Sequence, residues 1–173
     1  MLEDASEVAM APDIDVGTPA GVFVRSGIDE VSIGRVRRLL GEYDPSFRDR
    51  VFTSAERQYC ENTRYPAQHY AARWAAKEAF VKVLDAAAPS RPLTAAQIGV
   101  VRTDDGPRLE LEGDADAAFA ETLVANDVSD PTRCDVSVSL THDRDADVAA
   151  ACVVVVGLTD ERDRERKGGK ARE

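Results

Sequence analysis

A continuous helical pattern of apolar positions runs from Tyr70 to Leu84 and predicts the longest helix of the chain. The segment is rich in alanine and contains neither glycine nor proline, a composition that favours a helix. The positions that recur at roughly helical spacing should form its buried stripe: Ala71, Trp74, Ala75, Ala79 and Leu84. We expect the rest of the fold to be arranged around this helix.

Shorter patterns predict the surrounding elements. Alternating or β-branched apolar positions predict a strand that begins at Val22 and stops at Gly27, and further strands over 98–103, 109–111, 135–140 and 149–156. The last of these is apolar throughout, so we expect it to be buried on both faces. Helical spacing predicts helices over about 32–43, up to 51–52, over 53–62 and over 114–125. Strands and helices are mixed without regular βαβ repeats, so the predicted fold class is α+β.

The periodic region lies between two charged ends. Residues 1–20 hold five acids, no Lys or Arg and no periodicity, which predicts a flexible acidic leader. Residues 158–173 are charged and contain glycine, which predicts a charged flexible tail. A chain of 173 residues is long enough for one good core, so we expect a single folded domain over residues 21–157.

Charge and composition narrow the possible partners. The net charge of −10 disfavours nucleic acid as a partner of the whole protein. Residues 21–102 nevertheless hold 13 Lys or Arg against nine acids, which predicts a local basic surface for an anionic ligand or protein. No apolar run approaches the roughly 20 residues of a membrane helix, and no signal peptide opens the chain. The three widely spaced cysteines, Cys60, Cys134 and Cys152, indicate free thiols in a reducing cytoplasm.

Glu78 is the first candidate for chemistry, because it follows Trp74 by one helical turn and so lies beside a large aromatic side chain. Lys82 lies one turn further on, and one interpretation is an ordinary i,i+4 salt bridge between the two charges. The other interpretation is that the carboxylate binds a hard cation. Asp29, after the first strand, and His142, after a later strand, are weaker candidates, since such residues are common in turns and loops.

Four segments in a fixed order contain these candidates. They are Ser26-Gly-Ile-Asp-Glu-Val with Arg35, Phe47-Arg-Asp-Arg-Val-Phe-Thr with Glu56, Ala72-Arg-Trp-Ala-Ala-Lys-Glu-Ala-Phe-Val-Lys, and Val138-Ser-Leu-Thr-His. From about Val22 to Val156 the chain resembles the holo-acyl-carrier-protein synthases, the small type of the 4′-phosphopantetheinyl transferase superfamily. The resemblance implies the fold of that superfamily, a small antiparallel sheet packed with a long central helix. It also implies a homotrimer with sites between neighbouring subunits.

The same resemblance implies an enzyme that transfers the 4′-phosphopantetheine group of coenzyme A to a serine of an apo acyl carrier protein and releases 3′,5′-ADP. Asp29 and Glu78 match the family's Mg²⁺ ligands, and Mg²⁺ suits a diphosphate substrate because it prefers oxygen. The side chains that would bind phosphate oxygens are Arg73, Lys77, Lys82 and His142. Of these, Lys82 and His142 would act in catalysis together with Glu78. The acceptor of the serine proton stays open between water on the metal, a nearby carboxylate and His142.

Two arginines are candidates for docking the carrier protein, which could belong to fatty acid synthesis or to a specialised polyketide pathway. Arg35 and Arg38 lie about one turn apart on the polar face of the predicted helix after Asp29. Carrier proteins are commonly acidic, so these side chains would attract one despite the net negative charge of the chain. The alternative is that they only form a solvated helix face.

Two segments depart from the family's pattern. Its glycine-rich turn after the second lysine is replaced by Leu84-Asp-Ala-Ala-Ala, whose Cβ atoms restrict the backbone, and Asp104-Asp-Gly-Pro lacks the family's lysine. Arg91 is a candidate for the missing positive charge. Two alternatives to an active transferase therefore stay open. One is a degenerate, non-catalytic member that binds carrier protein or coenzyme A. The other is a structural domain whose Asp29 and Glu78 only form ion pairs with arginine and lysine side chains of the central helix.

Overall fold

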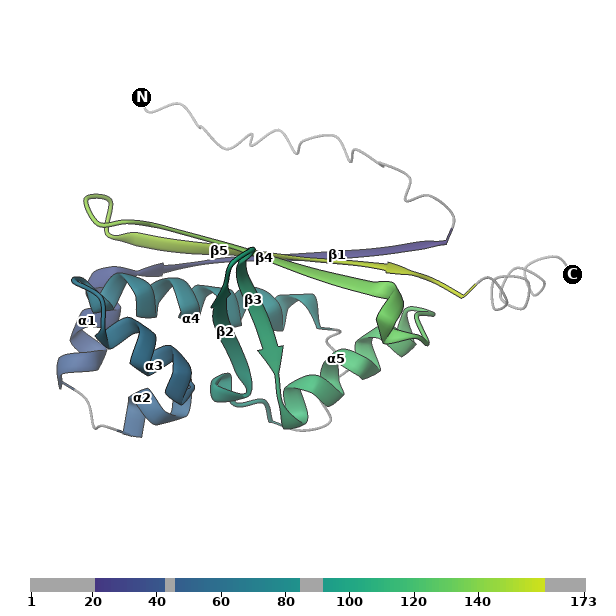
Figure 1. The fold of residues 1–173 in the computed structure, drawn as a ribbon, viewed down its shortest axis with the longest axis horizontal. Helices are drawn as coiled ribbons and strands as arrows, with labels where there is room; N and C mark the ends of the chain where they lie inside the picture. The colour runs from purple at the N-terminus through teal and green to yellow at the C-terminus, as the bar shows by residue number, and fades with distance from the viewer. Residues whose placement is uncertain (1–20, 43–45, 85–91, 161–173) are drawn as a thin grey trace, which may run out of the picture.

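One long helix lies against an antiparallel sheet in the computed structural model, which describes residues 21–42, 46–84 and 92–160 (Figure 1). In chain order the elements are β1 (Val22–Ser32), α1 (Ile33–Glu42), α2 (Ser46–Val51), α3 (Ser54–Glu61), α4 (Pro66–Val83), η1 (Ala95–Gln97), β2 (Ile98–Thr103), β3 (Gly106–Leu111), α5 (Gly113–Ala125), η2 (Pro131–Arg133), β4 (Cys134–Asp143) and β5 (Val148–Leu158). Their order confirms the α+β class. Three parts of the chain that carried predictions lie outside the described residues. They are the predicted leader, most of the glycine-free segment that follows Leu84, with Arg91, and the chain beyond residue 160.

The main sheet has the strand order β1-β5-β4, and all its neighbouring strands are antiparallel. β5 lies in the middle, and its inward side chains Ala149, Ala151, Val153 and Val155 are buried. Figure 1 shows the described helices on one side of this sheet only. The prediction that β5 is buried on both faces is therefore wrong for the single chain, because its outward positions are half-buried or exposed.

α4 packs along the inner face of the sheet through small side chains. Ala75, Ala76 and Ala79 are completely buried there. They let β1 come so close that a Cβ atom on Gly27 would lie 2.0 Å from the carbonyl oxygen of Ala79. Only glycine fits such a contact. The prediction that the first strand ends at Gly27 is wrong, since this glycine allows β1 to cross α4 and continue to Ser32.

The predicted central helix is confirmed and begins earlier than expected. α4 starts at Pro66, which occupies its first turn, where the missing N–H costs no hydrogen bond. The predicted stripe is buried except for Trp74, which is partly buried. Most of the circumference of α4 is covered, since Tyr70, Ala72 and Phe80 are buried as well.

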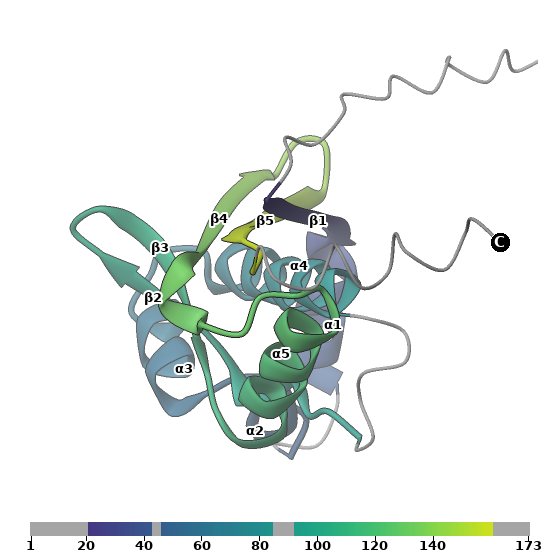
Figure 2. The same ribbon diagram turned by 90° about the vertical axis from the view of Figure 1, so that its right-hand side faces the viewer.

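Two smaller units cover the remaining sides of α4. α1, α2 and α3 gather at one end, whereas the β2–β3 hairpin and α5 lie further along, as Figures 1 and 2 show. At the start of α3, Thr53 Oγ1 accepts a hydrogen bond from the Glu56 backbone N–H at 3.2 Å. Glu56 Oε2 accepts one from the Thr53 N–H at 2.8 Å, so both halves of a capping box are present.

The strands at the end of the domain are longer than predicted. β4 continues to Asp143, so His142 lies within a strand and pairs with Ala149. β5 continues to Leu158, and Asp160 forms a salt bridge with Arg133 at 3.0 Å. Residues 158–160, which were predicted to lie in the tail, therefore belong to the folded region.

Candidate active site

One side of α4 presents three polar side chains at successive turns: Trp74, Glu78 and Lys82. The Lys82 ammonium donates to Asp29 Oδ1 at 2.8 Å and to the carbonyl oxygen of Ile28 at 2.7 Å. The Trp74 indole N–H donates to Glu78 Oε1 at 3.2 Å. The structure therefore brings Asp29 and Glu78 to the same side of α4, each held by a hydrogen bond from an α4 side chain.

The position of Asp29 follows from the path of β1. Gly27 lies against the Ala79 carbonyl, so the strand passes directly over α4 at this point. Side chains two residues apart lie on the same face of a strand, so Asp29 also faces the helix and reaches Lys82. The Asp29 side chain keeps 20% of its surface exposed, and Glu78 is exposed. Both carboxylates are accessible to a ligand from solvent.

These two carboxylates suit a magnesium ion. Glu78 Oε2 and Asp29 Oδ2 make no hydrogen bond within the described residues, so each carboxylate retains a free oxygen. No group of three or more His, Cys, Asp or Glu side chains that could bind a metal is present in the described ranges. Mg²⁺ usually takes one or two protein carboxylates and fills its remaining positions with water and substrate phosphates. The donor set fits such an ion only together with a phosphate ligand.

Two interpretations of the charges on α4 can now be compared with the structure. The i,i+4 salt bridge between Glu78 and Lys82 does not form, because Lys82 turns toward Asp29 and Glu78 pairs with Trp74. The ion pair between Asp29 and Lys82 does form, as the structural-domain alternative expects of this half of the site. That alternative fails for Glu78, whose partner is an indole and not a cation.

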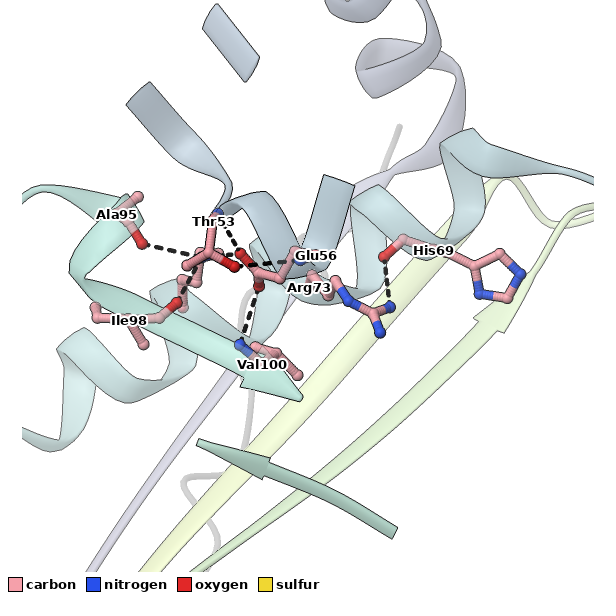
Figure 3. A network of polar contacts seen from close by, with 8 residues as sticks. Thr53, Glu56, His69, Arg73, Ala95, Ile98 and Val100 are labelled. Atoms are coloured by element: carbon pink, nitrogen blue, oxygen red, sulfur yellow. Dashed lines mark hydrogen bonds and ion pairs between the residues drawn. The ribbon is translucent and has the colours of Figure 1, made fainter. Parts of the chain in front are cut away.

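A second cluster lies between α4, β4 and the β2–β3 hairpin. A cavity of about 260 Å³ is lined there by Arg73, His142, His69 and Tyr59, among others. The Arg73 guanidinium lies 4.0 Å from the centre of the Tyr59 ring. It also donates to the His69 carbonyl at 3.3 Å (Figure 3). Arg73 is only 5% exposed, and its Nε–H has no hydrogen-bond partner. Arg73 and Arg102 both line the cavity, so its lining suits an anionic ligand.

His69 adds to this cluster and was not predicted. Its ring lies 5.1 Å from that of His142. Burial lowers the pKa of His69, and the charges of His142, Arg73 and Arg102 lower it further. The signal that would have identified it is its spacing, since His69 precedes Arg73 by four residues and shares its side of the helix.

Lys77 occupies neither cluster. Its side chain is 1% exposed, and its ammonium donates to Glu56 Oε2 at 2.8 Å and to the carbonyl oxygens of Ala95 and Ile98. These three acceptors are labelled in Figure 3. Glu56 Oε1 accepts in turn from the Val100 N–H at 3.0 Å. Burial lowers the pKa of Lys77, and the Glu56 carboxylate opposes this shift. All three ammonium donors are used inside the core, so this placement excludes Lys77 from the phosphate contacts that the resemblance implied.

The two clusters lie on opposite sides of α4. Nine residues separate His69 from Glu78 and Arg73 from Lys82, which is about half a turn around a helix axis at ~100° per residue. One chain therefore brings Asp29, Glu78 and Lys82 together but does not bring them to Arg73 and His142.

The predicted docking arginines lie on α1, beside the first cluster. The Arg35 guanidinium is 5.5 Å from the centre of the Trp74 ring, so it is adjacent to the indole that binds Glu78. Arg38 is exposed one turn further along α1. Arg35 is thus part of the surroundings of the first cluster, whereas Arg38 has only a surface position.

The sequence of this chain is similar to one protein family and to named members of it. The family described as the 4′-phosphopantetheinyl transferase superfamily matches residues 25–147. A holo-[acyl-carrier-protein] synthase of Syntrophus aciditrophicus is 39% identical over 138 residues, which cover 78% of this chain and 97% of that protein. The protein of the same name from Geobacter metallireducens is 38% identical over 131 residues, with 75% and 94% covered.

Solved structures give the same result at lower identity. The complex of a Chronobacterium ammoniagenes ACPS with CoA has a TM-score of 0.63 and 27% identity, covering 80% of this chain and 99% of that one. A holo-[acyl-carrier-protein] synthase from Neisseria meningitidis has a TM-score of 0.56 and 26% identity, covering 78% and 96%. These similarities confirm the predicted fold.

Proposed function

The chain belongs to the 4′-phosphopantetheinyl transferase superfamily, and from this membership we propose that it is a holo-acyl-carrier-protein synthase. The enzyme transfers the 4′-phosphopantetheine group of coenzyme A to a serine of an apo acyl carrier protein and releases 3′,5′-ADP. The observation that carries the proposal is the group on one side of α4, where Asp29 and Glu78 lie beside the Lys82 ammonium. Two carboxylates and a cation at one accessible surface suit a metal-bound diphosphate.

In this proposal Asp29 and Glu78 hold Mg²⁺. Such an ion would supply positive charge to the diphosphate and to the negative charge that develops on the leaving 3′,5′-ADP. Lys82 keeps Asp29 oriented through its 2.8 Å ion pair and offers positive charge to the same phosphates. Trp74 orients the Glu78 carboxylate.

Arg73 and His142 bind the anionic part of coenzyme A in the cavity of about 260 Å³. The position of Arg73 in the cavity lining supports this assignment, because its guanidinium carries a positive charge. Neutral His69 supplies a further ring nitrogen for hydrogen bonding at the edge of the cavity, since burial lowers its pKa. His142 and the site carboxylates remain the candidates for accepting the serine proton.

A complete site needs a second copy of the chain, which supports the expected homotrimer. The two halves of the site lie on opposite sides of α4 and face different directions. The sheet face without helices carries exposed apolar side chains, namely Val24 (51% exposed), Ile28 (68%), Val156 (42%) and Leu158 (48%). Contiguous apolar surface of this kind is typical of protein interfaces.

The carrier protein docks along α1. Arg35 and Arg38 offer positive charge to an acidic carrier, and Arg35 lies beside Trp74 at the first cluster. This position would bring the carrier serine toward the diphosphate. The described helices include none that is long and apolar enough to cross a membrane. Cys60, Cys134 and Cys152 are free, which supports a reducing compartment such as the cytoplasm.

The test is mass spectrometry of an apo acyl carrier protein after incubation with the enzyme and coenzyme A, with Mg²⁺ or with a chelator. The proposal expects the mass of the phosphopantetheine group on the carrier serine only when Mg²⁺ is present. A carrier that binds the chain but never gains mass would overturn the proposal in favour of the non-catalytic alternative. Equal modification with the chelator would refute the metal assignment alone.

A further inference from the structure

A cavity of about 700 Å³ opens at the N-terminal end of α4, between α1, the end of α3 and the turn that joins β4 to β5. It shares no lining residue with either half of the candidate active site. On α1, Arg37 lines it, two residues after Arg35 and therefore rotated by about 200° around the helix axis. The cavity thus lies on the side of α1 that faces away from Trp74 and the proposed carrier surface.

The polar part of the lining is mainly cationic: Arg37, Arg48, Arg64 and Arg144, against Glu61 and Asp145. Glu61 is already engaged, since it accepts from the Tyr70 hydroxyl at 3.2 Å and pairs with Arg48 at 3.5 Å. Within the described ranges, the other three arginines form no ion pair. Four guanidinium groups against two carboxylates leave the lining positively charged, which suits an anionic ligand.

Two arginines are held at the opening by one aromatic ring. The guanidinium carbons of Arg64 and Arg144 lie 5.2 Å and 3.8 Å from the centre of the Tyr65 ring. Tyr65 is also the N-cap of α4 and makes no side-chain capping bond, and Pro66 follows it. The uncapped, positive end of an 18-residue helix therefore opens beside the two guanidinium groups.

The floor of the cavity is apolar. Leu40, Pro66 and Ala67 are half-buried and supply its apolar surface, next to the fully buried Ile33 and Tyr70. A small inorganic anion would leave this floor uncovered, whereas a ligand with a hydrocarbon part would cover it. The volume lies within the ~300–1,000 Å³ of ordinary small-molecule sites.

We propose that this cavity binds a small amphipathic carboxylate, with its carboxylate at Arg64 and Arg144 and its hydrocarbon chain on the apolar surface of Leu40, Pro66 and Ala67. This is a second ligand site, which adjoins the coenzyme A half through a cavity of about 400 Å³ lined by Tyr65, Arg144 and His142. Guanidinium groups bind a carboxylate through paired N–H donors, and the uncapped amides of α4 lie next to them.

Isothermal titration calorimetry of the full chain tests the proposal with octanoate as the probe. Octanoate should bind measurably, and hexanoate more weakly by about fourfold for each methylene removed from the floor. Acetate and inorganic phosphate should give no measurable binding. Saturating coenzyme A should leave the octanoate affinity unchanged. Octanol that binds as tightly as octanoate, or coenzyme A that displaces octanoate, would overturn the proposal.

Substitutions locate the site. Arg64→Gln with Arg144→Gln should weaken octanoate binding by at least about tenfold, because both charges at the opening are lost. Both side chains are exposed, so the variant should keep the wild-type melting temperature. Arg108→Gln is the matched control, an exposed arginine on β3 outside the cavity, and should leave the affinity unchanged. Equal affinity for the double variant and the control would assign octanoate binding to another place and refute the site.

Discussion

Lys77 and Lys82 form two lysine–carboxylate pairs on the same helix with the same N–O distance of 2.8 Å, yet their surroundings differ completely. The pair of Lys77 with Glu56 is almost fully buried, at 1% and 0% exposure, and connects α4 to α3 and β2. The pair of Lys82 with Asp29 is open, at 53% and 20%. The two ion pairs therefore have the same N–O distance but different roles. The buried pair can act only on the fold, whereas the open pair can exchange partners with a ligand.

The largest expected effect is a loss of turnover when a carboxylate on the side of α4 that holds the open pair is removed. Asp29→Ala or Glu78→Ala should reduce turnover by at least about a thousandfold, because each removes a charged ligand of the proposed metal. Neither side chain belongs to the core, so the melting temperature should stay within a few degrees of wild type. Steady-state kinetics together with thermal unfolding measure both quantities. Near-normal turnover in both variants would refute the metal assignment.

The buried pair should respond in the opposite way. Lys77→Met leaves the Glu56 carboxylate buried without its cation and should cost about 3–5 kcal/mol of unfolding free energy. Lys77→Met with Glu56→Gln removes both charges and should recover part of that loss. Urea unfolding measures the difference. A loss of less than about 1 kcal/mol for Lys77→Met would mean that the buried pair contributes little to the fold.

Lys82→Met sharpens the contrast with Lys77. Its ion pair is more than half exposed on the lysine side, so the loss of unfolding free energy should stay below about 1 kcal/mol. The kcat/KM for coenzyme A should nevertheless fall by at least about tenfold, since a cation beside the diphosphate is lost. Unchanged kinetics with clear destabilisation would make Lys82 a structural residue like Lys77.

A smaller effect is expected on the surface of α1. Arg35→Glu with Arg38→Glu should raise the KM for the carrier protein by about tenfold, and added salt should narrow the difference. The KM for coenzyme A should change less for Arg38→Glu alone than for Arg35→Glu alone, because Arg35 lies beside Trp74. Steady-state measurement of both KM values distinguishes a docking surface from a solvated helix face. An unchanged KM for the carrier protein would mean that these arginines only form a solvated face.

The smallest expected effect concerns His69 and pH. Its pKa is lowered below the ordinary 6.5, chiefly by burial, so the unfolded chain binds this proton more readily than the folded chain. The contribution of His69 to stability is therefore present above pH 6.5 and is lost as the pH falls through its folded pKa. His69→Gln should reduce the loss of unfolding free energy between pH 7 and pH 5.5. An unchanged loss would assign this pH dependence to other groups.

Sequence reasoning identified the open pair because its residues belong to short, ordered segments. Glu78 and Lys82 are one turn apart, and Asp29 follows Gly27 within a recognisable motif, so the first cluster was expected from spacing and resemblance. Lys77 was misplaced because α4 is buried around most of its circumference. Its sequence alone does not tell which side meets α3 and which side meets solvent.

The remaining differences depend on contacts between distant segments. Gly27 was interpreted as a strand end because glycine is common in turns, but it marks the close passage of β1 over Ala79. His142 was expected after its strand, whereas pairing with Ala149 on β5 extends β4 beyond it. No local pattern contains this information, because the partner that fixes each backbone lies elsewhere in the chain.

The pairing of β1 with β5 has a consequence for the way the protein is made. Val22–Ser32 pairs with Val148–Leu158, so the first described strand finds its partner among the last. During synthesis on the ribosome, β1 emerges first and must wait until nearly the whole domain has been translated before this ladder can form. Asp29 reaches its place over α4 only once β1 has paired, so the proposed metal-binding half of the site should be among the last features to assemble in a nascent chain.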